Sequence, residues 1–235
     1  LDHTYDFVDY VSMHQYYGNE KNDTPSFLAN TMDMDRFINH IVSVCDYIQA
    51  KKRSKKVLNI SFDEWNVWYH AFADNAKAEK WKEKPAYNED QYNFEDALLV
   101  GGMMITLLKH ADRVKVACMA QLVNVIAPIM TENGGRIWKQ TIYYPYLHAS
   151  LYGRGTALNV LVDAPKYDCN EYTDVPALES IAVESEDGAY VTIFAMNRGE
   201  EDLEVTCCLR DYPGCCVEEF ITMAGYDLKQ YNTAD

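Results

Sequence analysis

The sequence feature that most constrains the fold is a change of pattern near residue 155. Before it, short apolar segments alternate with amphipathic ones in the order strand, helix, strand, helix, strand. The predicted strands are Phe7 to Met13, Val57 to Phe62 and Val114 to Met119. Strands separated by helices pair in parallel through right-handed crossovers, so this alternation predicts part of a (β/α) barrel.

The intervening helices are predicted from apolar residues at helical spacing. The first runs from Asp33 to Ile48 with one apolar face. The second follows Asn93 and Asp96, which have the spacing of an N-terminal cap, and a third is predicted from Tyr143 to Tyr152. The polar stretch from Asp74 to Gln91 is predicted to be a long loop.

The second part of the chain is predicted to be an antiparallel β-sandwich, similar to a jelly roll. Short strand candidates follow one another without helices, and Glu186-Asp187-Gly188 has the composition of a hairpin turn. We therefore divide the chain into a barrel part, residues 1–154, and a sandwich part, residues 155–235. The predicted strands of the sandwich are Thr156 to Val162, Leu178 to Glu184, Tyr190 to Asn197 and Leu203 to Leu209.

Composition excludes several classes of function. A formal net charge of -15 disfavours a nucleic acid or an anionic membrane as partner, while a neutral sugar is unaffected. The seven cysteines lack the spacing of a zinc site, so we expect no metal and no cofactor. Scattered thiols, with no apolar run long enough to cross a bilayer, predict a cytoplasmic protein. Because the chain opens without Met, its start is predicted to be a cut within a longer protein.

Candidate functional residues follow the predicted strands, where a (β/α) barrel carries its active site. Taken singly, each has a structural explanation: a lone Glu is more often a cap or a surface charge, a lone His is more often structural, and Trp is more often core. Their predicted position on one rim favours function instead. One carboxylate with aromatic rings and amides suits a neutral polyhydroxylated ligand. These residues are His14 and Tyr16, then Glu64, Trp65, Asn66 and Trp68, then Gln121 and Asn124.

Several of these segments resemble one enzyme family. Asp63 to Tyr69 (Asp-Glu-Trp-Asn-Val-Trp-Tyr) resembles the nucleophile motif of the family 51 α-L-arabinofuranosidases, and Val11 to Tyr17 is similar to the strand-end motif before it. The similarity extends through Asp96 to Gly102, Ala120 to Ile129 and Gln140 to Pro145. The resemblance implies the C-terminal half of a (β/α)8 barrel followed by a β-sandwich. It also implies an exo-acting retaining hydrolase that releases terminal arabinofuranosyl groups from arabinan, arabinoxylan or their oligosaccharides.

The same resemblance assigns roles to single residues. Glu64 would be the nucleophile that forms a covalent arabinosyl-enzyme, with Tyr16 and His14 holding its carboxylate ionised and aimed. Trp68 would form a wall of the sugar subsite, and Gln121 would hydrogen-bond to furanose hydroxyls. The remaining substrate-binding candidates are the amides Asn66 and Asn124.

The second carboxylate of a retaining hydrolase is not found at a predicted strand end. Retention needs an acid/base carboxyl about 5 Å from the nucleophile. In the family it lies in a Gly-Asn-Glu motif at an earlier strand. Gly18-Asn19-Glu20 imitates this motif but follows the His-Gln-Tyr motif, so Glu20 is interpreted as a loop carboxylate. The chain alone is therefore predicted to lack the acid/base.

Two other functions remain open from the sequence. A related retaining glycosidase, for instance a β-xylosidase, would share the barrel and the nucleophile. A carbohydrate-binding or assembly module would explain the β-rich C-terminal third but not a Glu64 placed between a strand and two Trp residues. The resemblance also implies a homo-oligomer, whereas the preferred arabinose linkage is not predicted.

Overall fold

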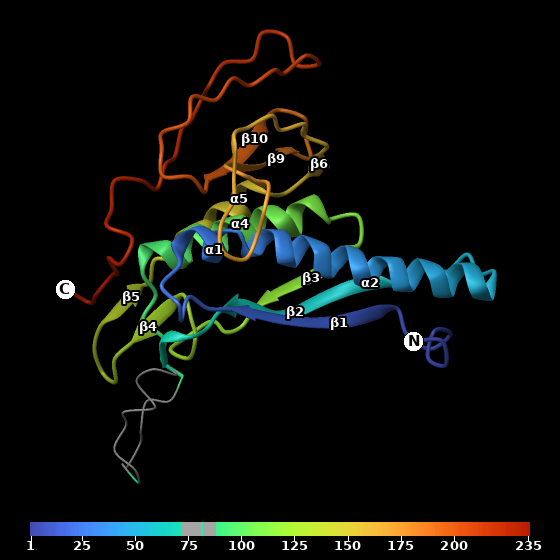
Figure 1. Ribbon diagram of the computed structural model, residues 1–235, viewed down its shortest axis with the longest axis horizontal. Helices are drawn as coiled ribbons and strands as arrows, with labels where there is room; N and C mark the ends of the chain where they lie inside the picture. Colours follow the sequence, from blue (N-terminus) through green and yellow to red (C-terminus); the bar gives the residue numbers. More distant parts are fainter. Residues whose placement is uncertain (72–80, 82–87) are drawn as a thin grey trace.

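The computed structural model describes residues 1–71, 81 and 88–235, and the chain forms three layers (Figure 1). A parallel sheet lies on one side, helices form the middle layer, and a small antiparallel sheet lies on the other side of the helices. Within the described ranges, no helix combines the length and the apolar character needed to cross a membrane.

The parallel sheet has the order β1-β2-β3. It consists of β1 (Tyr10–Tyr17), β2 (Asn59–Val67) and β3 (Val114–Met119). Both pairs, β1 with β2 and β2 with β3, are parallel, which confirms the prediction from the alternating pattern. Parallel neighbours need long crossover connections, and the helices of the middle layer provide them.

Among the described residues, four helices make the middle layer. The long α2 (Asn30–Lys52) follows the short α1 (Thr24–Leu28) and connects β1 to β2. The crossover from β2 to β3 contains α4 (Phe94–Lys109), whose predicted cap is confirmed. Asn93 accepts a hydrogen bond from the backbone N–H of Asp96, and Asp96 accepts one from Asn93 in return. The last helix is α5 (Tyr143–Tyr152), with the predicted bounds.

The main core lies between the parallel sheet and these helices. On β2, Ile60 and Phe62 are fully buried, and they belong to one cluster with apolar residues of α2 and α4. Burying one such side chain contributes about 1.5–3 kcal/mol to the free energy of folding. The helices therefore cover the face of the sheet that carries these apolar residues. The helical members of the cluster include Met34, Ile38, Leu99 and Met103.

The second part of the chain is built from antiparallel pairs, as predicted. Its larger sheet has the order β10-β9-β6, from β6 (Thr156–Leu158), β9 (Leu178–Glu184) and β10 (Val191–Asn197). The turn between β9 and β10 is closed by a backbone hydrogen bond from Gly188 to Ser185, with Gly188 at a φ of 69°. This part also contains the two-stranded pair of β7 (Lys166–Tyr167) with β8 (Val175–Pro176). Another antiparallel pair, β4 (Ile129–Thr131) with β5 (Ile137–Lys139), lies before α5 in the first part of the chain.

Several predicted boundaries were wrong. The first strand begins at Tyr10, and Phe7, its predicted start, is 86% exposed. The strand predicted at Thr156 to Val162 stops at Leu158, where its pairing with β9 ends. Leu203 to Leu209 forms no strand, since among the described residues no neighbouring strand offers it hydrogen bonds. The loop predicted from Asp74 to Gln91 lies mostly outside the described residues.

Candidate active site

A bulge in β2 determines which way the candidate nucleophile points. Ser61 of β2 pairs with Ser12 of β1, and the next pair along the strands is Glu64 with His14. Over this stretch β2 therefore contains one residue more than β1. The pairing with β3 shifts over the same stretch, between Phe62 and Trp65. The extra residue moves the buried position from Phe62 to Trp65, so Glu64 avoids the helix face. Its side chain is 46% exposed.

Two residues of β1 reach the carboxylate of Glu64. Tyr16 donates a hydrogen bond from its hydroxyl to Glu64 Oε2 at 2.9 Å. His14 places Nδ1 at 3.5 Å from the same oxygen. The two residues are two positions apart on β1 and therefore share one face of the sheet. The structure thus brings together the three residues that the sequence predicted to act as a unit.

The Tyr16 hydroxyl is held in its protonated form. Partial burial, followed by the hydrogen bond to and the negative charge of Glu64, raises the pKa of Tyr16 to about 12. A tyrosine with this pKa remains a donor at any pH in which a protein ordinarily works. The Tyr16–Glu64 hydrogen bond therefore does not titrate near neutrality.

Ser12 and Asp63 extend the cluster and were missed by sequence reasoning. Ser12 donates from Oγ to Asp63 Oδ1 at 2.8 Å, and His14 Nε2 lies 3.5 Å from Asp63 Oδ2. The hydrogen bond from Ser12 lowers the pKa of Asp63, with His14 contributing in the same direction. His14 therefore lies between two carboxylates. The signal for Ser12 was its spacing, since Ser12, His14 and Tyr16 alternate along one strand.

The two tryptophans that follow Glu64 have different environments. Trp65 is fully buried and stacks on Tyr146 with ring centroids 6.4 Å apart, so it belongs to the core. Trp68 is only partly buried, and its ring meets that of Tyr16 edge-on at 5.3 Å. The backbone N–H of Trp68 donates to the carbonyl of Tyr17 at 2.9 Å. Trp68 therefore stands beside the Tyr16–Glu64 pair.

The predicted amides occupy supporting and exposed positions. Asn66 is fully buried and donates from Nδ2 to the carbonyls of Ala120 and Ile126, at 2.7 and 2.8 Å. It thus holds the segment after β3 instead of facing the open surface. Within that segment Gln121 is exposed, while Asn124 exchanges hydrogen bonds with Thr131.

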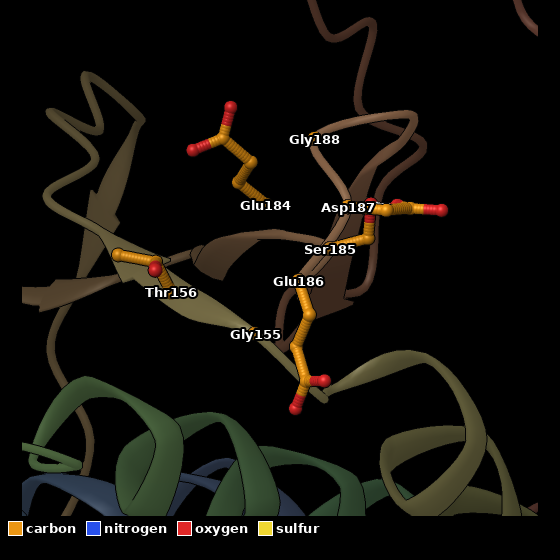
Figure 2. A pocket seen from close by; sticks show the side chains of 7 residues that line it. All are labelled: Gly155, Thr156, Glu184, Ser185, Glu186, Asp187 and Gly188. Carbon is orange, nitrogen blue, oxygen red and sulfur yellow. Dashed lines mark hydrogen bonds between the residues drawn. The ribbon is translucent and has the colours of Figure 1, made fainter.

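Glu20 and the glutamates of the antiparallel sheet take no part in the hydrogen bonds of this cluster. Glu20 is exposed in the loop between β1 and α1, the loop position expected from the sequence. On the antiparallel sheet, a hollow of about 550 Å³ is lined by Gly155, Thr156 and 184–188 (Figure 2). Its two glutamates, Glu184 and Glu186, point in different directions (Figure 2). The helix layer separates that hollow from the parallel sheet (Figure 1). Among the described residues, no group of His, Cys, Asp and Glu is placed to hold a metal ion.

These observations define a mixed α/β protein with a carboxylate cluster and an aromatic ring at the end of a parallel sheet. Comparison with known proteins gives the family. Residues 63–235 match the family described as the α-L-arabinofuranosidase C-terminal domain. The chain belongs to this family, the C-terminal region of the family 51 α-L-arabinofuranosidases.

Similar proteins cover nearly all of the chain. An intracellular exo-α-(1→5)-L-arabinofuranosidase 1 from Bacillus subtilis is 53% identical over 99% of this chain and 46% of that protein. An intracellular exo-α-(1→5)-L-arabinofuranosidase from Halalkalibacterium halodurans is 55% identical over 99% of this chain and 47% of that protein. The solved structure of a family 51 α-L-arabinofuranosidase from Bifidobacterium longum has a TM-score of 0.76 at 38% identity, covering 84% of this chain and 40% of that one. The chain thus spans about half the length of these curated relatives.

Proposed function

We propose that this chain supplies the nucleophile side of the active site in a retaining exo-α-L-arabinofuranosidase. The observation that carries the proposal is the 2.9 Å hydrogen bond from Tyr16 to Glu64 on the open face of the parallel sheet. A carboxylate fixed by a protonated phenol, half-exposed and beside an aromatic ring, suits attack on a sugar carbon.

In the proposed reaction, Glu64 attacks the anomeric carbon while the bond to the leaving oxygen breaks and that oxygen takes up a proton. The product is a covalent arabinosyl ester, which water then hydrolyses with a second inversion and hence overall retention. Tyr16 and His14 hold the carboxylate in place before the attack. Trp68 provides the wall of the sugar subsite, Gln121 hydrogen-bonds to furanose hydroxyls, and Asn66 and Asn124 support the segment that carries Gln121.

The acid/base carboxyl is proposed to come from outside this chain. Asp63 is a poor acid, since the Ser12 hydrogen bond lowers its pKa and keeps it ionised. Glu20 is an exposed residue of the loop after β1 and follows the His-Gln-Tyr motif, so we propose that it is a loop carboxylate and not the acid/base. We infer that a longer protein carries the acid/base in an upstream part, consistent with the length of the curated relatives.

The same reasoning supports a complete barrel. Parallel sheets occur in proteins that cover both of their faces, yet among the described residues only the helix side of β1-β2-β3 is covered. We propose that residues 1–154 are the C-terminal half of a (β/α)8 barrel whose interior this open face lines, and that residues 155–235 belong to a β-sandwich. The site residues would then lie at the C-terminal rim of the barrel.

For the substrate, the names of two relatives, both exo-α-(1→5)-L-arabinofuranosidases, suggest terminal α-(1→5)-linked arabinofuranosyl groups. Those names also suggest an intracellular enzyme, in agreement with the cytoplasmic location expected from the cysteines. A homo-oligomer is expected from the family resemblance alone. No cofactor has a role in this mechanism.

The test uses the longer enzyme that carries this chain, with an aryl α-L-arabinofuranoside as substrate. The enzyme should release arabinose with retention, and Glu64→Gln should abolish release because an amide forms no ester intermediate. The 235-residue chain alone should turn over negligibly, since it lacks general-acid catalysis worth roughly 10²- to 10⁴-fold. Release of xylose from an aryl β-xyloside in place of arabinose would favour the xylosidase alternative. Sugar binding without hydrolysis by the longer protein would favour a binding module.

A further inference from the structure

A buried carboxylate fixes the backbone that follows the nucleophile strand. Asp90 is 1% exposed, and its carboxylate accepts hydrogen bonds from three successive backbone N–H groups. The donors are Tyr69 and His70 at 3.2 Å and Ala71 at 2.6 Å. Burial raises the pKa of Asp90, whereas the three N–H bonds stabilise its ionised form and oppose this rise. They hold a turn that begins directly after Trp68.

The side chain of His70 attaches this turn to the first turn of α4. His70 Nε2 lies 2.8 Å from Asp96 Oδ2, and Asp96 is fully buried. The same oxygen accepts the backbone N–H of Asn93 at 2.8 Å and so caps α4. Because the capping box fixes Asp96, it gives the imidazole a rigid partner.

The ring of His70 is enclosed by aromatic and charged groups. It packs on Tyr69 with centroids 3.9 Å apart and meets Tyr92 edge-on at 6.3 Å. Burial disfavours the charged ring, but the hydrogen bond and charge of Asp96, aided by Asp90, raise the pKa of His70. The positive charge of Lys229, in the C-terminal segment, lowers the pKa of His70. Lys229 itself forms an ion pair with Glu95. Carbonyls of the same segment, at Leu228 and Gln230, accept the first N–H groups of α4.

We propose that His70 is a positioning residue that fixes Trp68 beside the Tyr16–Glu64 pair through its hydrogen bond to Asp96. This inference rests on the proposed function, because it assigns Trp68 to the sugar subsite. Trp68 is attached on its N-terminal side by its N–H bond to Tyr17. On its C-terminal side, the Asp90 bonds orient the backbone, and the His70–Asp96 bond prevents the turn from rotating about it.

The chain contains a matched pair that serves as control. His110 Nε2 lies 2.7 Å from Asp35 Oδ1, a His–Asp contact of nearly the same length at the other end of α4. His110 is 14% exposed at its side chain, comparable to the 24% of His70. It is the C-cap residue of α4, whereas Asp96 lies in the first turn of that helix. The two acceptors differ, since Asp96 is fully buried and the side chain of Asp35 is 46% exposed, so the two variants are compared by their KM and not by their stability.

The experiment compares His70→Phe, His110→Phe and His70→Gln in the longer enzyme, with an aryl α-L-arabinofuranoside. His70→Phe keeps a ring against Tyr69 but loses the bond to Asp96, so KM should rise about 10-fold with kcat changed by less than about 3-fold. His110→Phe should leave both constants at the wild-type values. His70→Gln keeps an N–H donor at similar reach, so its KM should return most of the way to the wild-type value.

The outcomes separate this inference from the proposed function. Absence of arabinofuranosidase activity in the wild-type enzyme would overturn the proposed function itself. An active wild type with folded His70→Phe indistinguishable from His110→Phe overturns the positioning role alone. If KM of His70→Gln stays as high as that of His70→Phe, the positioning role is also overturned, because restoring a donor to Asp96 would then have no effect on KM. If His70→Phe does not fold, His70→Met, which also has no donor for Asp96, is assayed instead, and an unchanged KM in that variant overturns the proposal.

Discussion

Removal of one oxygen atom from Tyr16 tests the arrangement around Glu64. Tyr16→Phe keeps the ring and its edge-on contact with Trp68 at 5.3 Å but deletes the 2.9 Å hydrogen bond to Glu64 Oε2. A hydrogen bond to a charged group contributes about 1.5–3 kcal/mol, and the partial exposure of Glu64 favours the lower end. A loss of about 1.5–2 kcal/mol corresponds to a fall in kcat/KM of about 10- to 30-fold.

The adjacent Tyr17 provides the control for this prediction. Its hydroxyl donates to Asp33 at 3.1 Å on the helix side of the sheet, so Tyr17→Phe also deletes a tyrosine–carboxylate bond. That variant should lose stability and keep its kcat/KM. The assay is arabinose release by both variants of the longer enzyme, together with thermal unfolding. A Tyr16→Phe enzyme within about 2-fold of wild type, or an equal loss in Tyr17→Phe, would refute the reasoning.

The Tyr16→Phe substitution should also change the titration of the protein at alkaline pH. The folded-state pKa of Tyr16 is about 12, above its ordinary value of 10.0, so the folded protein binds this proton more tightly than the unfolded chain. The stability that the hydroxyl contributes is therefore complete below about pH 10 and is lost as the pH rises toward 12. The difference between the absorbance titrations of wild type and Tyr16→Phe should show one tyrosine that ionises near pH 12, and ionisation of that tyrosine near pH 10 would contradict the assignment.

Three further predictions concern the supports of the site. Asn66→Ala leaves the carbonyls of Ala120 and Ile126 without their donor, so it should lower the unfolding free energy by about 1–3 kcal/mol in denaturant titration and reduce kcat/KM; full stability would contradict this. Because the pKa of His70 is raised, its stabilising contribution is complete below about pH 6.5 and is lost as the pH rises through the folded-state pKa. The difference in unfolding free energy between wild type and the non-titrating His70→Gln should accordingly shrink from pH 6 to pH 8, and a constant difference would exclude this linkage. Asn93→Ala removes the N-terminal cap of α4 and should cost about 1 kcal/mol in thermal unfolding, and no change would mean that the C-terminal segment caps α4 without it.

The order of the elements in the first part followed from periodicity. The parallel pairing of β2 with β3, the span of α5 and the cap of α4 were all predicted, because they depend on local patterns that α/β folds leave intact. The strand predicted at Leu203 to Leu209 is not present, because a local pattern alone does not determine a strand. Alternation describes only one strand, whereas a strand forms only where a partner offers hydrogen bonds.

The site was predicted in its residues but not in its geometry. Glu64, Tyr16 and His14 were predicted from their position at strand ends, yet all three lie within the paired strands. The bulge that turns Glu64 to the open face leaves no mark in a single sequence, since it is defined by the registers of two neighbouring strands. Asn66 illustrates the same limit: its place after a predicted strand made it a substrate-binding candidate, but it is buried and hydrogen-bonds to the backbone of the segment after β3.

Covalent trapping tests the central claim, that Glu64 is the nucleophile. The longer enzyme is incubated with an arabinofuranosyl donor that carries fluorine at C2 and a good leaving group, so that the ester intermediate forms faster than it hydrolyses. Peptide mass spectrometry should then find the sugar on the peptide that contains Glu64, and Glu64→Gln should carry no label. A label on another carboxylate, or turnover with inversion and no label at all, would contradict the account.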